Sequence, residues 1–161
     1  MSSCRQQALI EAPIGAVWSL VGDPRRYPEW AGHVVQVTGL PSVDEGATYR
    51  QVTRLPLRAI TTDFLIDSRE DMRDIRLRCL RSGFYSRWLL TEARGATFAE
   101  AEVGMEPPAL RYRAVDTALG WRWYRRILHE SFDGLRAAAE RQQAVTPGLA
   151  TGAVSGRGWS R

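Results

Sequence analysis

The sequence predicts an α+β protein with one domain of residues 1–143, in which an antiparallel sheet of about seven strands is covered by a long C-terminal helix. Two observations support this prediction. Short segments between residues 34 and 105 alternate apolar and polar side chains, as half-buried strands do. A proline-free segment near the C-terminus then repeats apolar residues at helical spacing, and it is long enough to cross a sheet.

The N-terminal elements are short. Residues 4–11 alternate loosely and predict a first strand, which ends at Ala12-Pro13. The segment Pro13–Val21 places apolar residues three and four positions apart and predicts an amphipathic helix. The segment Pro24–Trp30 predicts a second short helix, which Pro28 interrupts. Neither helix can form a core alone, so both must pack on the rest of the chain.

Six further strands follow at short intervals, joined by turn-forming residues, which indicates an antiparallel meander. They are predicted at Val34–Leu40, Ala47–Leu55, Ala59–Ser68, Arg73–Arg81, Ser86–Ala93 and Thr97–Met105. By alternation, one face of this sheet carries Tyr49, Gln51, Thr53, Thr62, Phe64, Ile66, Leu77, Cys79, Trp88, Leu90, Ala99, Ala101, Val103 and Met105. Because that face is largely apolar, the sheet needs a cover.

The predicted cover is a helix over Ala114–Gln143. One stripe of this helix carries the residues that should face the sheet, namely Tyr124, Ile127, Leu128, Ser131, Leu135 and Ala138. The remaining residues, 144–161, are rich in Gly, Ser and Thr without periodicity, and they predict a flexible tail.

Composition narrows the function classes. The net charge is +4 and all 22 basic residues are arginine, but they are interspersed with acidic residues, which argues against nucleic-acid binding. No apolar run approaches the ~20 residues of a membrane span, and no secretory signal is visible, so we expect a cytoplasmic protein. Cys4 and Cys79 are expected to be thiols rather than a disulfide, and no metal or nucleotide motif is present, so we expect no metal and no cofactor.

Two sequence blocks resemble a known superfamily. Ile10-Glu11-Ala12-Pro13, followed by Val17-Trp18, Asp23 and Arg26-Tyr27-Pro28-Glu29-Trp30, is similar to the opening signature of the START-like (SRPBCC) superfamily, the Bet v 1 and polyketide cyclase/dehydrase group. The segment from Arg126 to Glu140 resembles the C-terminal helix of that group, and the resemblance spans about residues 5 to 142. It implies the helix-grip (Bet v 1-like) fold, a curved sheet wrapped around the long helix.

A bent sheet and a helix laid across it leave space for a mostly apolar cavity. We therefore expect the protein to bind a hydrophobic small molecule. The resemblance implies that this molecule could be polyketide-derived and that the protein could promote its cyclisation or dehydration without a cofactor. A non-catalytic carrier or chaperone of a lipid, quinone or other hydrophobic metabolite is the alternative, and an interaction module without a cavity is a third. Both monomer and homodimer are compatible with the sequence.

Four residues are candidates for proton transfer or hydrogen bonding to a ligand: His33, Tyr49, Gln51 and Thr62. Polar side chains on the inner face would meet water or a ligand, unless these strands face the other way near a sheet edge. For His33 the alternative is a histidine in a surface loop, and His129 is expected to face solvent. The candidate ligand-binding residues are Phe64, Ile66, Leu77, Trp88, Leu90, Ala101, Val103, Met105, Tyr124, Ile127, Leu128 and Ser131.

Two further features concern partners and chemistry. A group of arginines could attract an anionic ligand, an acyl carrier protein or a phosphopantetheine arm, although a solvated face is the commoner explanation; they are Arg111, Arg113, Arg122, Arg125 and Arg126. The aromatase/cyclases of the group carry a tyrosine after the second short helix and an inward arginine on a central strand. Those positions align with Val34 and Ser68, so this proton-transfer set does not carry over to the present sequence.

Overall fold

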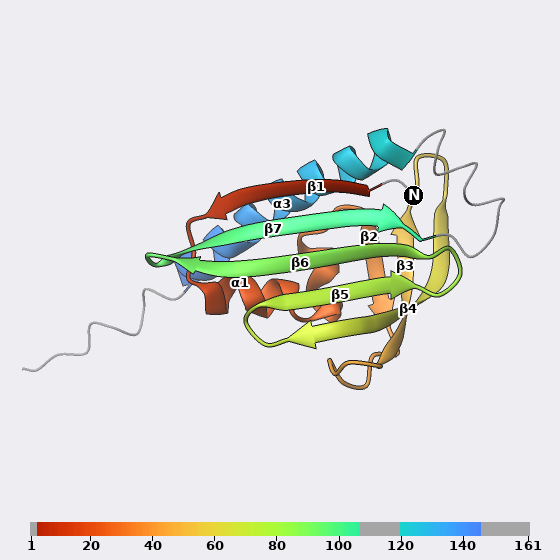
Figure 1. Cartoon of the computed structure of the whole chain (residues 1–161), viewed down its shortest axis with the longest axis horizontal. Helices are drawn as coiled ribbons and strands as arrows, with labels where there is room; N and C mark the ends of the chain where they lie inside the picture. Colours follow the sequence, from red (N-terminus) through yellow and green to blue (C-terminus); the bar gives the residue numbers. More distant parts are fainter. Residues whose placement is uncertain (1–2, 107–119, 146–161) are drawn as a thin grey trace, which may run out of the picture.

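The computed structural model describes residues 3–106 and 120–145. Within them, seven antiparallel strands form one curved sheet in the order β1-β7-β6-β5-β4-β3-β2, and α3 lies behind the sheet, along its β1 and β7 side (Figure 1). This confirms the predicted sheet covered by a C-terminal helix. The elements are β1 (Ser3–Ile10), α1 (Ile14–Val21), η1 (Pro24–Glu29), β2 (Val34–Thr38), β3 (Thr48–Arg54), β4 (Ala59–Glu70), β5 (Asp74–Cys79), β6 (Phe84–Ala93), β7 (Ala96–Met105) and α3 (Trp121–Val145).

The element bounds differ from the sequence prediction in a few places. Strand β6 begins at Phe84, two residues before the predicted start, and β4 continues to Glu70. Helix α3 includes Ala144 and Val145, which the sequence assigned to the tail. The predicted helical residues 114–119 and the remaining predicted tail, 146–161, lie outside the described residues.

A tight turn fixes the register of the longest hairpin. Arg94 and Gly95 join β6 to β7, and both have positive φ, 51° and 85°. Positive φ at both central residues is the conformation of the two-residue turns that match strand twist, and glycine adopts it without strain. The resulting register pairs Trp88 with Ala101 and Leu90 with Ala99, so large side chains on β6 lie beside small ones on β7.

The two short N-terminal helical segments are held by hydrogen bonds from buried aromatic residues. The carboxylate of Asp23 accepts a hydrogen bond from the backbone N–H of Arg25 and caps η1 (3.0 Å). The hydroxyl of Tyr27 donates to the carbonyl of Val21 (2.9 Å), and Nε1 of Trp30 donates to the carbonyl of Leu20 (3.1 Å). Because these bonds tie η1 to α1, they also fix the short connection that leads from η1 into β2.

The C-terminal half of α3 is attached to the N-terminal segments. Gly134 lies against the backbone carbonyl of Trp30, where a Cβ atom would overlap the oxygen. Further along the helix, Nε2 of Gln143 donates to the carbonyl of Glu11 (3.1 Å) and the Arg141 guanidinium donates to the carbonyl of Glu29 (3.5 Å). The predicted apolar stripe of α3 is buried, and Phe132, which the sequence analysis did not assign to it, is buried with it.

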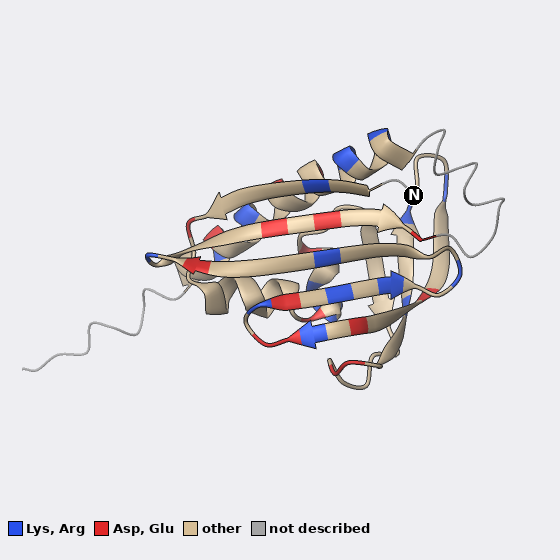
Figure 2. Ribbon diagram, viewed as in Figure 1, with Lys and Arg blue, Asp and Glu red and all other residues tan. Residues whose placement is uncertain are grey.

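The outward face of the sheet carries arginines beside acidic side chains of nearby strands or of the residue that follows β7 (Figure 2). The closest pairs are Arg5–Glu102 (2.9 Å), Arg78–Asp67 (2.7 Å), Arg76–Glu106 (2.8 Å) and Arg87–Asp74 (2.7 Å). Exposed pairs of this kind each contribute about 0–1 kcal/mol. Their main consequence is that the arginines of this face are interspersed with acidic partners, as the sequence analysis expected.

A bulge in β4 changes which side chain points inward near the end of that strand. The pairing of β4 with β5 shifts between Ile66 and Ser68, so the partner of buried Ile75 is Arg69. The Arg69 guanidinium lies over the Trp18 ring (5.3 Å) and pairs with Asp71 (2.5 Å). An inward arginine therefore exists on this strand, one residue after the position that the sequence alignment selected.

Candidate functional site

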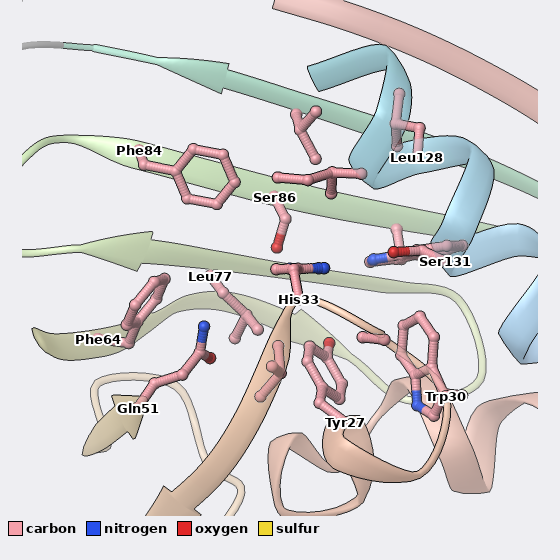
Figure 3. A pocket seen from close by; sticks show the side chains of 15 residues that line it. Tyr27, Trp30, His33, Gln51, Phe64, Leu77, Phe84, Ser86, Leu128 and Ser131 are labelled. Atoms are coloured by element: carbon pink, nitrogen blue, oxygen red, sulfur yellow. The ribbon is translucent and has the colours of Figure 1, made fainter. Parts of the chain in front are cut away.

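A pocket lies between α3 and the concave face of the sheet, closed on a third side by η1 and the start of β2 (Figure 3). The sheet contributes residues from β3 to β7, because alternate side chains of each strand point to this face. The residues that line it are Tyr27, Trp30, Ala31, His33, Val34, Gln51, Phe64, Leu77, Phe84, Ser86, Trp88, Val103, Ile127, Leu128 and Ser131.

The pocket is small. The volume open to the centre of a water-sized sphere is about 20 Å³, which is room for about one water molecule. Aromatic rings from facing elements fill much of the interior: Trp88 on β6 packs against Trp30 (5.2 Å between ring centroids) and against Phe132 of α3 (5.1 Å). The interior, which was expected to be partly vacant, is therefore almost filled, because the side chains of both layers reach further across it than strand alternation alone indicates.

The predicted site residues divide into two groups. Those that line the pocket are His33, Gln51, Phe64, Leu77, Trp88, Val103, Ile127, Leu128 and Ser131. The others point to the same interior but lie outside the pocket lining; Met105 is partly buried, and the buried members are Tyr49, Thr62, Ile66, Leu90, Ala101 and Tyr124.

Several lining residues of the pocket were not predicted from the sequence. Tyr27 and Trp30 were read as part of the superfamily signature, and they both support η1 and face the pocket. Phe84 and Ser86 occupy the first inward positions of β6, on the same face as Trp88. Extending the alternation of Trp88 and Leu90 back by four residues would have identified both.

Three polar side chains of the central strands face inward. Gln51, Thr53 and Thr62 are all buried, and Gln51 and Thr62 are paired across β3 and β4. Nε2 of Gln51 donates to Oγ1 of Thr53 (2.9 Å), so one end of the Gln51 amide is satisfied within the protein. The alternative that these residues point to solvent near a sheet edge is therefore wrong.

His33 projects from the turn just before β2 into the pocket, in the space between Ser86 of β6 and Ser131 of α3 (Figure 3). Its Nδ1 is buried and has no hydrogen-bond partner among the described residues. Burial lowers the pKa of His33 to about 4, and the negative charge of Glu130 opposes this shift only in part. His33 therefore lines the pocket and is uncharged at neutral pH, although it lies in the turn before β2 and is partly exposed, whereas His129 is exposed as expected.

The lowered pKa of His33 predicts that the stability of the protein depends on pH. The unfolded chain binds the imidazole proton near pH 6.5 and the folded chain only near pH 4, so the free energy of unfolding falls as the pH drops through this window. We expect wild type to lose about 2 kcal/mol between pH 7 and pH 4.5 through this group. Urea unfolding of wild type and His33→Gln at several pH values measures this loss. In the variant, the free energy of unfolding should not show this part of the decrease with falling pH. Equal slopes in both proteins would contradict the assignment.

Tyr49 is the second buried polar group without a partner. Its ring stacks on Phe64 (5.7 Å), and its hydroxyl has no hydrogen bond within residues 3–106 and 120–145. Burial raises the pKa of Tyr49 well above its ordinary value, with smaller contributions from Tyr27 and Cys79, so the hydroxyl keeps its proton at neutral pH. Tyr49 is thus a hydrogen-bond donor enclosed in the interior.

Replacing Tyr49 with phenylalanine should stabilise the protein. A buried donor without a partner costs about 1–3 kcal/mol, and the substitution removes only the hydroxyl. We expect the free energy of unfolding to rise by about 1 kcal/mol, measured by urea unfolding at pH 7. A loss of stability would mean that the hydroxyl has a partner in the folded protein.

Other binding chemistries find less support among the described residues. No group of three or more His, Cys, Asp and Glu side chains there is placed to hold a metal ion, and Cys4 and Cys79 are free thiols. An open outer groove of about 700 Å³ lies where α1 and η1 meet the end of α3, and it is lined by Arg26, Glu29 and Arg141 together with apolar residues such as Ala138 and Val145. None of the helices in the part of the chain described here is both long and apolar enough to cross a membrane.

Comparison with known proteins identifies the family of nearly the whole chain. Residues 1–140 match the family described as polyketide cyclase / dehydrase and lipid transport. No curated protein matches the sequence.

Solved structures share the fold at low sequence identity. The Zhui aromatase/cyclase from Streptomyces sp. R1128 is 14% identical, with a TM-score of 0.68 over 92% of this chain and 99% of that one. A START superfamily protein from Mycobacterium smegmatis is 12% identical, with a TM-score of 0.64 over 87% and 98% of the two chains. A protein from Thermus thermophilus is 13% identical, with a TM-score of 0.68 over 88% and 99%.

Proposed function

The chain belongs to the polyketide cyclase/dehydrase and lipid transport family, and on that premise we propose that it binds a hydrophobic small molecule between α3 and the sheet. One observation carries the proposal. His33 Nδ1 and the Tyr49 hydroxyl are buried in this interior without partners among the described residues. Buried polar groups are normally paired, so their arrangement favours a ligand or water as the missing partner. The surrounding apolar and aromatic side chains suit a hydrophobic molecule.

Binding of anything larger than water requires side chains to move. The space now open holds about one water molecule, and the rings of Phe84 and Trp88 border it. Phe84 lies near the beginning of α3, where it packs on Trp123 (5.6 Å) and Tyr124 (6.1 Å). The proposal therefore includes a rearrangement of pocket side chains when the ligand enters.

A neutral fluorescent probe tests the proposal. We expect N-phenylnaphthylamine to bind wild type saturably, with energy transfer from the pocket tryptophans Trp30 and Trp88 to the probe. Replacing Ser86 with leucine fills the pocket and should weaken probe binding by about tenfold or more. Fluorescence titration of both proteins measures the effect.

The matched control is Thr91→Leu. Thr91 is exposed on the opposite face of the same strand, so the substitution adds the same side chain outside the pocket. This variant should bind the probe as wild type does, and thermal unfolding checks that both variants are folded. Undiminished probe binding by a folded Ser86→Leu variant would contradict the proposed site.

Cyclisation or dehydration of a polyketide-derived ligand is a second candidate. At neutral pH the Tyr49 hydroxyl keeps its proton and can donate a hydrogen bond to a substrate oxygen. The uncharged His33 can accept one from a substrate hydroxyl. Gln51 and Thr62, which are also buried, complete the proposed set. A base with a pKa near 4 is weak at pH 7, and this favours binding without turnover, as in a carrier of a lipid or quinone. Turnover of a model poly-carbonyl substrate that is lost in both His33→Ala and Tyr49→Phe would support catalysis, and retention of that turnover would contradict it.

An acyl carrier protein is the proposed donor of such a substrate. Arg122 and Arg125 are exposed at the beginning of α3, where an acidic partner can reach them (Figure 2); Arg111 and Arg113 lie outside the described residues. Replacing Arg122 and Arg125 together with glutamate should weaken binding of an acyl carrier protein in a calorimetric titration. Unchanged affinity would remove this partner from the proposal.

A further inference from the structure

The chemistry of the pocket lining restricts the charge of the ligand. None of the fifteen residues that line the pocket is Arg, Asp or Glu. The titratable ones are His33, which is uncharged at neutral pH, and Tyr27, whose hydroxyl already donates to the carbonyl of Val21. The pocket therefore offers polar contacts but no formal charge.

The arginines that neighbour pocket residues in the sequence cannot supply that charge, because strand alternation directs them to the other face. The inward Arg69 is not among the lining residues, and its guanidinium lies over the Trp18 ring and pairs with Asp71. Arg50, Arg76 and Arg87 are direct neighbours of Gln51, Leu77 and Trp88 in sequence. Each pairs with an acidic residue on the outward side of the sheet. The charge that reaches His33 is negative and comes from Glu130, which itself pairs with Arg126 (2.7 Å). An anionic ligand would lose its hydration and gain no cation in return.

The polar groups that do face the pocket are suited to a neutral oxygen. His33, Ser86 and Ser131 come from three different elements and face the same space, with the Gln51 amide on the sheet side (Figure 3). Imidazole and hydroxyl groups can each donate or accept a hydrogen bond, so together they match a carbonyl or hydroxyl oxygen. His33 is the member whose buried Nδ1 has no partner among the described residues.

From this arrangement we propose that the site selects uncharged hydrophobic ligands that carry a carbonyl or hydroxyl group, and that His33 recognises this oxygen. The inference rests on the proposed function, because it names the ligand class of the same pocket. It makes the protein a poor binder of fatty acids and other carboxylates, whatever their apolar part.

Three ligands with one ring system test the selectivity: acetylnaphthalene, isopropylnaphthalene and naphthoate, substituted at the same ring position. Each is titrated at pH 7 against wild type that holds the N-phenylnaphthylamine probe. We expect the ketone to displace the probe at the lowest concentration and the carboxylate to need at least about tenfold more.

A His33→Leu variant tests the role of the imidazole. It should bind the hydrocarbon as well as wild type does, but lose the preference for the ketone over the hydrocarbon, and Thr91→Leu should keep that preference. Displacement by naphthoate as effective as by the ketone, or a ketone preference that survives in His33→Leu, would overturn the inference and leave the proposed function standing. Failure of wild type to bind the probe and all three ligands would overturn both.

Discussion

Replacing Gly134 with alanine should lower the free energy of unfolding by about 3 kcal/mol. In most helices this substitution stabilises by about 0.5–1 kcal/mol, because glycine has the greater conformational freedom when unfolded. Here the added methyl group would overlap the backbone carbonyl of Trp30, and a backbone atom cannot move aside as a flexible side chain does. Helix α3 would have to separate from the segment that carries Trp30. Urea unfolding at pH 7 measures the change.

Gly15→Ala is the matched control for this prediction. Gly15 also lies in a helix, and a Cβ atom there would meet only the Met72 side chain at an ordinary contact distance of 3.5 Å. The same substitution should therefore be neutral or slightly stabilising at position 15. Equal changes in the free energy of unfolding at the two positions would show that the Trp30 carbonyl does not prevent a methyl group at position 134.

Replacing Trp88 with alanine should be the second large perturbation, with a loss of about 4 kcal/mol. The Trp88 ring is 3% exposed and connects three elements, since it projects from β6 and packs on Trp30 after η1 and on Phe132 of α3. Its removal leaves a cavity that neighbouring side chains cannot fill without breaking their own contacts. The midpoint of urea unfolding provides the measurement.

Trp121→Ala provides the comparison for the same chemical change at the surface. Trp121 is 57% exposed, and the Arg125 guanidinium lies over its ring, 4.8 Å from the centroid. Its loss should cost less than about 1 kcal/mol. A similar cost for both tryptophans would be incompatible with the central packing position of Trp88.

Most of the fold follows from local patterns in the sequence. Alternation of apolar and polar residues is strict in β5, and burial alternates regularly along β3, so the inward face of those strands was predicted correctly. The bulge in β4 was not predicted, because an inserted residue leaves no clear mark in a strand where Asp67, Ser68 and Arg69 are all polar. Its effect was to turn Arg69 inward and to place it against Trp18.

The candidate site was only partly predictable, for a different physical reason. Which strand face a residue occupies depends on position in the chain, and this identified Gln51, Leu77 and Trp88. How much space remains between two layers depends on side-chain rotamers and helix placement, and no local pattern encodes either. The sequence therefore indicated many of the wall residues of the pocket but not how little space they leave between them.

The contact between Gly134 and the Trp30 carbonyl also sets the mechanical limits of the interior. Together with the bonds of Arg141 and Gln143, it anchors the second half of α3 to the N-terminal helical segments. If the pocket widens to admit a ligand, we expect the movement in the half of α3 that precedes Gly134 and in the aromatic rings packed against it, such as Phe84. Gly134 would then act as a hinge point, with the movable half of α3 before it and the anchored half after it.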